Sequence, residues 1–409
     1  MQAEDFSMNI ARKAYCRIFQ TVFRIAIPIL PYYNPEIIDS LQQVPDVLRK
    51  KNVTSVLIIT DKGITGLGLQ KGLEEALQKA DISYAIYDKT VPNPTTANVE
   101  EAYGIYKEKG CQALIGFGGG SSMDCAKGVG ARVANPKKPL RKMRGILKVR
   151  HKLPTLLAVP TTAGTGSETT LAAVIVDSET RHKYVINDFP LIPKYAVLDP
   201  SVTLSLPPSI TSTTGMDALT HAVEAYIGRS TTKETRSQAL EAVSLIFANL
   251  KTAYSDGKNV EARRNMLRAA YLAGCAFTKS YVGYVHAVAH SLGGEYNVPH
   301  GLANAILLPS VLEEYGKVIY PKLKRLAIAA GIAGEDTVEE KAAKDFIEAV
   351  KELNRGFNIP STVKELREED IEKLSAYADS EGNPLYPVPV LMDRKELEKL
   401  YRNVLEVKA

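Results

Sequence analysis

The first half of the chain alternates short apolar runs with stretches of helical periodicity. The runs are four or five residues long, and several end in turn residues, which predicts buried strands. Between them, apolar positions recur three and four residues apart, which predicts amphipathic helices. The predicted strands lie at residues 56–59, 83–87, 113–117, 156–159, 172–176 and 195–198, and the predicted helices at 69–80, 96–109 and 122–133. This alternation is typical of a mostly parallel sheet covered by helices.

The pattern changes after Pro207 and Pro208, because strand-like runs disappear and long helical stretches replace them. Helices are predicted at residues 216–227, 233–254, 260–278, 285–292, 302–312, 321–330 and 338–353. We therefore expect an N-terminal extension at 1–20, an α/β domain at 21–207 and an all-α domain at 208–409. Within the α/β domain, residues 21–30 are expected to be strand-rich.

Composition narrows the class of protein. The chain has 409 residues, a formal net charge of +5 and 45% hydrophobic residues, as in ordinary globular proteins. Polar residues at Arg17, Gln20 and Arg24 interrupt the most apolar N-terminal stretch, so we expect neither a signal peptide nor a membrane span. The four cysteines form no CxxC pair, which favours a reducing compartment. We expect a cytoplasmic protein with neither nucleic acid nor membrane as a partner.

Histidine and aspartate positions predict a metal site. Of six histidines, four fall in two short segments. Asp217 and His221 are four residues apart on a predicted helix, and so are His286 and His290, so each pair shares a helical face. His300 follows shortly after. Imidazoles with a carboxylate suit Fe(II) or Zn(II). Five candidates are more than a tetrahedral site needs, so one is expected to be catalytic, and spacing alone does not choose it.

Two loops predict a dinucleotide site in the α/β domain. Residues 118–121, Gly-Gly-Gly-Ser, follow a predicted strand and open a helix, where backbone N–H groups can face a pyrophosphate. Residues 161–167, rich in threonine and glycine, end another strand, at the edge where such sheets bind ligands. Asp61 ends the first strand and could accept ribose hydroxyls, or could simply cap the turn before Gly63.

Together these motifs resemble the iron-containing, group III alcohol dehydrogenase family. The matching segments read GGGSSMDCAK at 118–127, PTTAGTGSE at 160–168, GMDALTH at 215–221, HAVAH at 286–290 and PHG at 299–301. The resemblance extends over nearly the whole chain from about Phe23 onward. It implies a dehydroquinate synthase-like architecture: an α/β nucleotide-binding domain, an all-α C-terminal domain that binds metal, and an active site between them.

The resemblance also implies roles for individual residues. Asp217, His221, His286 and His300 match the metal ligands of the family, and His290 matches a histidine beside the substrate that is suited to proton relay. An acid at the position of Asp61 implies a preference for NAD, with NADP as the alternative. Positions that line the cofactor cleft are matched by Asp61, Asn93, Gly119, Gly120, Ser121, Asp124, Thr161, Thr162, Thr165 and Lys183.

The expected function is interconversion of a primary alcohol or diol and its aldehyde, by metal-assisted hydride transfer to NAD(P). The metal is expected to be Fe(II), with Zn(II) as the alternative, and the protein a homodimer. Three other interpretations remain: polyol oxidation like that of zinc-dependent glycerol dehydrogenase, a lyase resembling dehydroquinate synthase, and a metal that only braces two domains. The lyase would need several basic residues around the metal to hold a phosphate.

Overall fold

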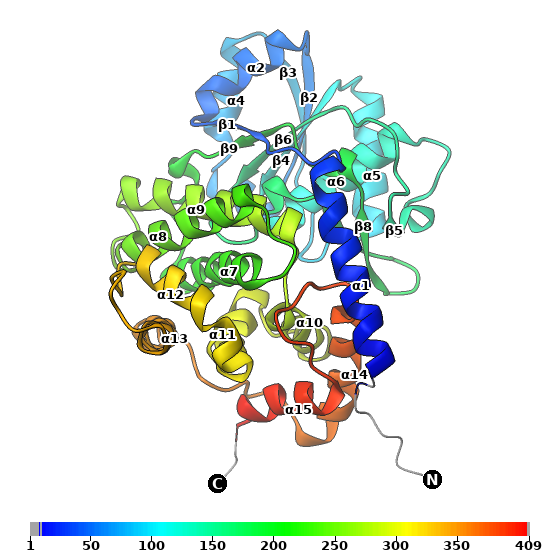
Figure 1. Ribbon diagram of the computed structural model, residues 1–409. Helices are drawn as coiled ribbons and strands as arrows, with labels where there is room; N and C mark the ends of the chain where they lie inside the picture. The colour runs from blue at the N-terminus through cyan, green and yellow to red at the C-terminus, as the bar shows by residue number, and fades with distance from the viewer. Residues whose placement is uncertain (1–7, 9, 407–409) are drawn as a thin grey trace. The chain divides into compact units, whose positions relative to one another are not determined.

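A computed structural model describes residue 8 and residues 10–406. The chain divides into two compact units (Figure 1). The α/β unit contains residues 31–206 and 258–267, and the helical unit contains 207–257, 268–409 and the residues before 31. Each unit has its own secondary structure and its own part of the predicted chemistry.

A parallel sheet of six strands forms the centre of the α/β unit. Its order is β1-β9-β6-β4-β2-β3, and every neighbouring pair is parallel. The strands are β1 (Glu36–Ile38), β2 (Ser55–Ile59), β3 (Ser83–Tyr87), β4 (Ala113–Gly118), β6 (Thr155–Pro160) and β9 (Tyr195–Val197). The predicted parallel sheet is therefore confirmed.

Both faces of this sheet are buried, and alternate side chains of one strand enter different cores. Leu57 and Ile59 of β2 pack in one hydrophobic cluster, whereas Val56 and Ile58 pack in the other. This two-sided burial explains why the strands read as continuous apolar runs. Helices α5 (Thr96–Glu108) and α6 (Gly120–Ala134) contribute to the first core, and α2 (Val44–Lys50), α3 (Lys62–Leu67) and α4 (Lys71–Lys79) to the second.

A second, smaller sheet completes the α/β unit. It has the order β5-β8-β7, where β5 is Gly145–Ile146, β8 is Lys183–Asn187 and β7 is Ala172–Val176. Strands β7 and β8 pair antiparallel, and β5 pairs parallel to β8. The predicted strand at 172–176 is confirmed, but it lies in this sheet and not in the main one.

The helical unit consists of long helices, as the sequence predicts. Those in its C-terminal part are α7 (Pro208–Ile227), α8 (Lys233–Ser255), α9 (Val260–Ser280), α10 (Tyr284–Tyr296), α11 (His300–Tyr315), α12 (Tyr320–Ala329), α13 (Glu339–Gly356), α14 (Ile371–Gly382) and α15 (Arg394–Asn403). The first residues of α9 group with the α/β unit. Within the described ranges, every helix is too short or too polar to cross a bilayer.

The strand-rich segment expected at residues 21–30 is wrong. Residues 10–26 form helix α1 (Ile10–Ala26), a 3-10 turn follows at Ile27–Ile29, and the whole segment groups with the helical unit. Arg12, Cys16 and Gln20 recur every four positions and so share one face of the helix. Arg12 and Gln20 hydrogen-bond to the rest of the unit from this face, and Cys16 is buried on it.

Candidate metal centre and cofactor loops

Helix α7 presents Asp217 and His221 to the interior of the helical unit. The two residues are one helical turn apart, and they are only 2% and 4% exposed. The His221 ring stacks on Phe277, with centroids 4.2 Å apart, and on His286 at 4.6 Å. Packing on both sides therefore fixes the orientation of this imidazole.

The turn from α10 to α11 brings the other two histidines to the same place. His286 lies on α10, which ends at Asn297 in the left-handed conformation, and His300 opens α11. A Cβ atom on Gly301 would lie 2.4 Å from the carbonyl oxygen of Thr213, so only glycine allows α11 to approach α7 this closely. His300 Nε2 consequently lies 3.5 Å from Asp217 Oδ1.

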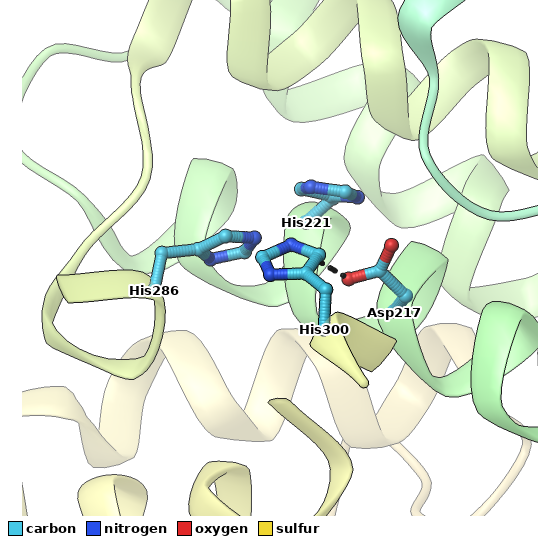
Figure 2. Close-up of side chains that lie close together, drawn as sticks. All are labelled: Asp217, His221, His286 and His300. Carbon is cyan, nitrogen blue, oxygen red and sulfur yellow. Dashed lines mark ion pairs between the residues drawn. The ribbon is translucent and has the colours of Figure 1, made fainter. Parts of the chain in front are cut away.

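The four side chains predicted as ligands point toward one another (Figure 2). One potential ligand atom from each of them lies within 4.8 Å of all the others. Three of the four residues are buried, and only His300 is partly exposed. All four belong to the helical unit, so these four side chains by themselves do not join the two units.

One atom of Asn304 lies close to three of the four candidate ligands, so their acceptor atoms face a common point. Its Nδ2 donates to Asp217 Oδ1 at 2.7 Å and lies 3.2 Å from His286 Nε2 and 3.1 Å from His300 Nε2. Its buried Oδ1 has no hydrogen-bond partner among the described residues. Three imidazoles and one carboxylate around one point fit a divalent metal such as iron or zinc. The sequence analysis missed Asn304, although it follows His300 by one helical turn.

Glu224 is a second residue that the sequence analysis missed. Its Oε2 lies 2.5 Å from His286 Nδ1, and its Oε1 accepts the N–H of Val285 at 2.8 Å. Burial raises the pKa of Glu224 to about 7, against the opposing effect of hydrogen bonds from backbone N–H groups. Burial and the neighbouring imidazoles hold the pKa of His286 well below its usual range. A neutral His286 that donates from Nδ1 leaves its Nε2 lone pair free for a metal.

We expect Glu224→Gln to weaken metal binding by about 10- to 100-fold, as is usual for partners of metal-bound histidines. The amide has one acceptor atom where the carboxylate offers two, so either His286 or Val285 loses its partner. Chelator competition would measure the dissociation constant. The matched control is Glu241→Gln, at an exposed ion pair with Arg268 in the same unit. Equal affinities in both variants would contradict the assigned role.

His290, the fifth candidate, lies beside the group of four. Its side chain is 43% exposed, and its ring lies over His300 with centroids 5.1 Å apart. His290 Nδ1 lies 2.6 Å from Glu381 Oε1, which also accepts the hydroxyl of Tyr386 at 2.6 Å. Burial alone would raise the pKa of Glu381, but the charge of His290 and hydrogen bonds from His290 and Tyr386 hold that pKa below its usual range.

In the α/β unit, the residues predicted to bind the cofactor collect where β2, β4 and β6 end. The turn after β4 needs glycine, since Gly118 has a φ of 147°. The N–H of Thr161 donates to the carbonyl of Gly118 at 3.0 Å, which joins the two loops. Thr162 Oγ1 is buried and has no hydrogen-bond partner among the described residues. Gly120 faces Thr165, since a Cβ on the glycine would lie 3.5 Å from the threonine hydroxyl oxygen.

Hydrogen bonds bring further predicted residues together. Lys183 Nζ donates to Asn93 Oδ1 at 2.7 Å, and the Asn93 N–H donates to Ser121 Oγ at 3.2 Å. Asp61 behaves as a helix cap, because its Oδ1 accepts the N–H groups of residues 63 and 64 at the start of α3. Its Oδ2 accepts the hydroxyl of Ser122 at 3.2 Å. The capping interpretation of Asp61 is thus confirmed, and a role toward ribose stays a prediction.

Asp124 belongs to a buried polar cluster under these loops. Its Oδ1 accepts the hydroxyl of Ser167 at 2.8 Å, and its Oδ2 accepts the N–H of Val174 at 3.1 Å. Lys127 Nζ donates to Ser167 Oγ at 3.0 Å, and burial lowers the pKa of Lys127 to about 8. Burial also raises the pKa of the neighbouring Glu168 to about 7. The bonds of Asp124 therefore hold the loop in place, whereas contact with a cofactor stays a prediction for this residue.

The buried Glu168 carboxyl predicts a pH-dependent cost in stability. Its pKa is about 7 in the folded protein and 4.5 ordinarily, so between these values the folded state binds more protons than the unfolded state. Stability from this group therefore falls as pH rises from 4.5 to 7. Glutamine carries no charge, so Glu168→Gln should not show this fall. The free energy of unfolding of the variant minus that of wild type should therefore increase by up to about 3 kcal/mol as the pH rises through that range. Urea unfolding at several pH values measures this difference, and parallel curves would refute it.

Comparison with known proteins places both units in one family. Residues 37–200 match the family model described as iron-containing alcohol dehydrogenase. Residues 211–405 match the model described as Fe-containing alcohol dehydrogenase family, C-terminal. The first match covers the main sheet and the glycine-rich loop, and the second covers all five histidine and aspartate candidates.

Individual relatives agree with the family models. Alcohol dehydrogenase 4 of Saccharomyces cerevisiae is 40% identical over 345 residues, which is 83% of this chain and 88% of the yeast protein. The crystal structure of a 1,3-propanediol oxidoreductase is 33% identical, covers 91% of this chain and 98% of its own, and superposes with a TM-score of 0.87. A sulfoacetaldehyde reductase from Bifidobacterium kashiwanohense, solved in complex with NAD+, is 26% identical, covers 92% of this chain and 99% of its own, and has a TM-score of 0.81. The chain belongs to the iron-containing alcohol dehydrogenase family.

Proposed function

We propose that this protein interconverts a primary alcohol or diol and its aldehyde, with NAD(P) as the hydride carrier and one divalent metal ion at Asp217, His221, His286 and His300. The observation that carries the proposal is the convergence of these four donor groups in a member of an alcohol dehydrogenase family. When bound, the ion would act as a Lewis acid toward the substrate oxygen. Iron follows from the family, and zinc suits the same donor set.

The residues of the helical unit have separate tasks in this proposal. Glu224 keeps His286 in the tautomer that binds metal, and Asn304 orients Asp217 through its 2.7 Å hydrogen bond. His290, oriented by Glu381, takes the proton that the alcohol loses and releases it toward solvent, to which its side chain is 43% exposed. The hydrogen-bond partners described for His286, His290 and Asp217 are two carboxylates and an amide, whereas a phosphate-binding lyase needs basic partners.

The α/β unit would hold the dinucleotide at the carboxyl edge of its sheet. The glycine-rich turn and the N-terminus of α6 suit a pyrophosphate, and the buried hydroxyl of Thr162 lacks a protein partner among the described residues. The complex of the related sulfoacetaldehyde reductase with NAD+ supports NAD as the dinucleotide. The proposed cofactor residues are Asp61, Asn93, Gly119, Gly120, Ser121, Asp124, Thr161, Thr162, Thr165 and Lys183. We also propose a homodimer, which rests on the family resemblance alone.

Asp61→Ser tests the preference for NAD without removing the helix cap. Serine caps helices about as well as aspartate, so α3 should keep its N-terminus. Without the carboxylate, the repulsion of a 2′-phosphate disappears. Cofactor preference is measured as kcat/KM with NADP divided by kcat/KM with NAD. We expect this ratio to rise by about tenfold or more, which corresponds to roughly 1.4 kcal/mol in the relative binding of the two cofactors. An unchanged ratio would remove Asp61 from cofactor selection.

The decisive experiment for the proposed function is a reconstitution assay. Metal-free protein is loaded under anaerobic conditions with Fe(II) or Zn(II), and NADH or NADPH formation is followed with a panel of alcohols, diols and glycerol. We expect turnover of primary alcohols or diols that depends on the metal. Preference for glycerol with zinc would favour the polyol interpretation, and the absence of any net production of reduced cofactor would favour the lyase.

A further inference from the structure

Helix α1 lies on the helical unit with its polar side inward. The Arg12 guanidinium donates to both carboxylate oxygens of Asp379, at 2.9 and 2.8 Å. Arg17 donates to the carbonyls of Val388 and Pro389 at 2.7 and 2.9 Å. Gln20, only 3% exposed, donates to the carbonyl of residue 386 at 2.8 Å. These charge-assisted and buried hydrogen bonds fix which face of the helix meets the protein.

The opposite face of α1 and the turn after it form an exposed apolar stripe. Its members recur three and four residues apart, so they share one side of the helix. They are Tyr15, Ile18, Val22, Ile25 and Ile29, exposed by 59%, 64%, 61%, 68% and 84%. A surface helix normally buries its apolar side and exposes its polar side. Here the outward side is apolar, and the inward side combines the hydrogen-bonding groups with Cys16 and with Phe23, which packs on Tyr281. The outward stripe is therefore suited to an external apolar partner. Figure 1 shows α1 as the dark blue helix near the N-terminus.

Charge decides between the partners that could cover the stripe. Residues 10–30 contain four cations, Arg12, Lys13, Arg17 and Arg24, and no acidic residue. Lys13 and Arg24 are exposed. Pairing of α1 with α1 of a second copy would bring these cations together without a carboxylate from either helix. An anionic lipid surface offers an apolar interior for the stripe and negative headgroups for the cations.

Contrary to the expectation from the sequence that no membrane is a partner, we propose that α1 is a docking helix that binds the surface of a bilayer containing anionic lipids. Helix α1 is 17 residues long and carries charges along its length, so it fits an orientation in the plane of the interface. The stripe enters the boundary between headgroups and acyl chains. Lys13 and Arg24 are exposed on the sides of the helix away from the stripe, where they add long-range attraction to the negative headgroups, while Arg12 and Arg17 hold the helix to the protein. The inference does not depend on the proposed enzymatic function.

Vesicle flotation of the full-length protein tests the proposal. We expect binding to vesicles of phosphatidylcholine mixed with phosphatidylglycerol, much weaker binding to phosphatidylcholine alone, and release by added salt. The triple variant Ile18→Glu, Val22→Glu, Ile25→Glu should bind more than about tenfold less, because it puts three charges into the stripe. These side chains point away from the protein, so thermal unfolding should be unchanged. The variant Lys13→Glu, Arg24→Glu keeps the stripe and should also lose affinity for anionic vesicles.

A matched control replaces exposed apolar residues elsewhere on the helical unit. Val318, Val338 and Tyr377 are 64%, 70% and 54% exposed, so changing all three to glutamate alters charge and apolar surface as the stripe variant does. This control should still float with anionic vesicles. The proposal is overturned if wild type stays with the soluble fraction, or if the stripe variant binds as well as the control does. It is also overturned if the stripe variant has a lower molar mass by light scattering than both wild type and the control variant. That result would mean that a second copy of the chain covers the stripe.

Discussion

Replacing His286 with alanine should abolish stoichiometric metal binding and lower kcat/KM by about a thousandfold or more, since Lewis-acid stabilisation contributes several kcal/mol. His286 is the buried centre of the group: its Nε2 faces Asn304 with Asp217 and His300, and its Nδ1 lies 2.5 Å from Glu224. Its loss removes one proposed ligand and also leaves the buried Oε2 of Glu224 without its imidazole partner, while Oε1 keeps the N–H of Val285. Metal analysis of the purified protein and steady-state kinetics with a primary alcohol measure both effects.

Two further variants separate loss of the ligand from loss of structure. His182→Ala removes an exposed histidine of the α/β unit and should change neither metal content nor activity. His286→Ala with Glu224→Leu also removes the carboxylate that has lost its imidazole partner, so it should recover part of the lost stability without recovering metal. Normal metal content and turnover in the single His286 variant would show that the ion is held elsewhere.

The sheet could be predicted from the sequence because its strands have a simple physical signature. Strands β2, β4 and β6 are buried on both faces, so they read as unbroken apolar runs between turn residues. Helix α1 was predicted wrongly because its isoleucine, valine and phenylalanine content favours a strand locally. What makes it a helix is a polar face whose partners, Asp379 and residues 384–389, lie over 350 residues away in the chain.

The candidate ligands were visible because metal ligands on helices repeat at short, fixed spacings. Asp217 and His221 show the four-residue interval directly, and so do His286 and His290. The same rule could have found Glu224, which follows His221 by three positions on α7. A lone glutamate on a helix, however, is far more often a solvated surface residue. Glu381 carries no such signal, because it is 91 residues from His290 and only the packing of α14 against α10 joins them.

His290→Ala should give the opposite pattern to His286→Ala: full metal content with kcat/KM lower by about 10²- to 10³-fold, the usual contribution of a general acid or base. His290 lies beside the candidate ligands, and its Nδ1 already has a carboxylate partner in Glu381. In the proposed mechanism, Nε2 is the atom that exchanges a proton with substrate or solvent. Full activity at all pH values in His290→Ala would remove this residue from the mechanism.

Glu381 is expected to act on the reaction only through His290, whose Nδ1 lies 2.6 Å from its Oε1. Glu381→Gln keeps an oxygen that can accept from His290 Nδ1, but it loses the charge that favours the imidazolium, so we expect about a tenfold fall in kcat/KM. A double-mutant cycle then gives a sharp test. In the His290→Ala background, Glu381→Gln should have almost no further effect, because the group that it orients is gone. If the two losses multiply instead, Glu381 contacts the reacting groups independently of His290, and a relay that runs from Glu381 through His290 is wrong.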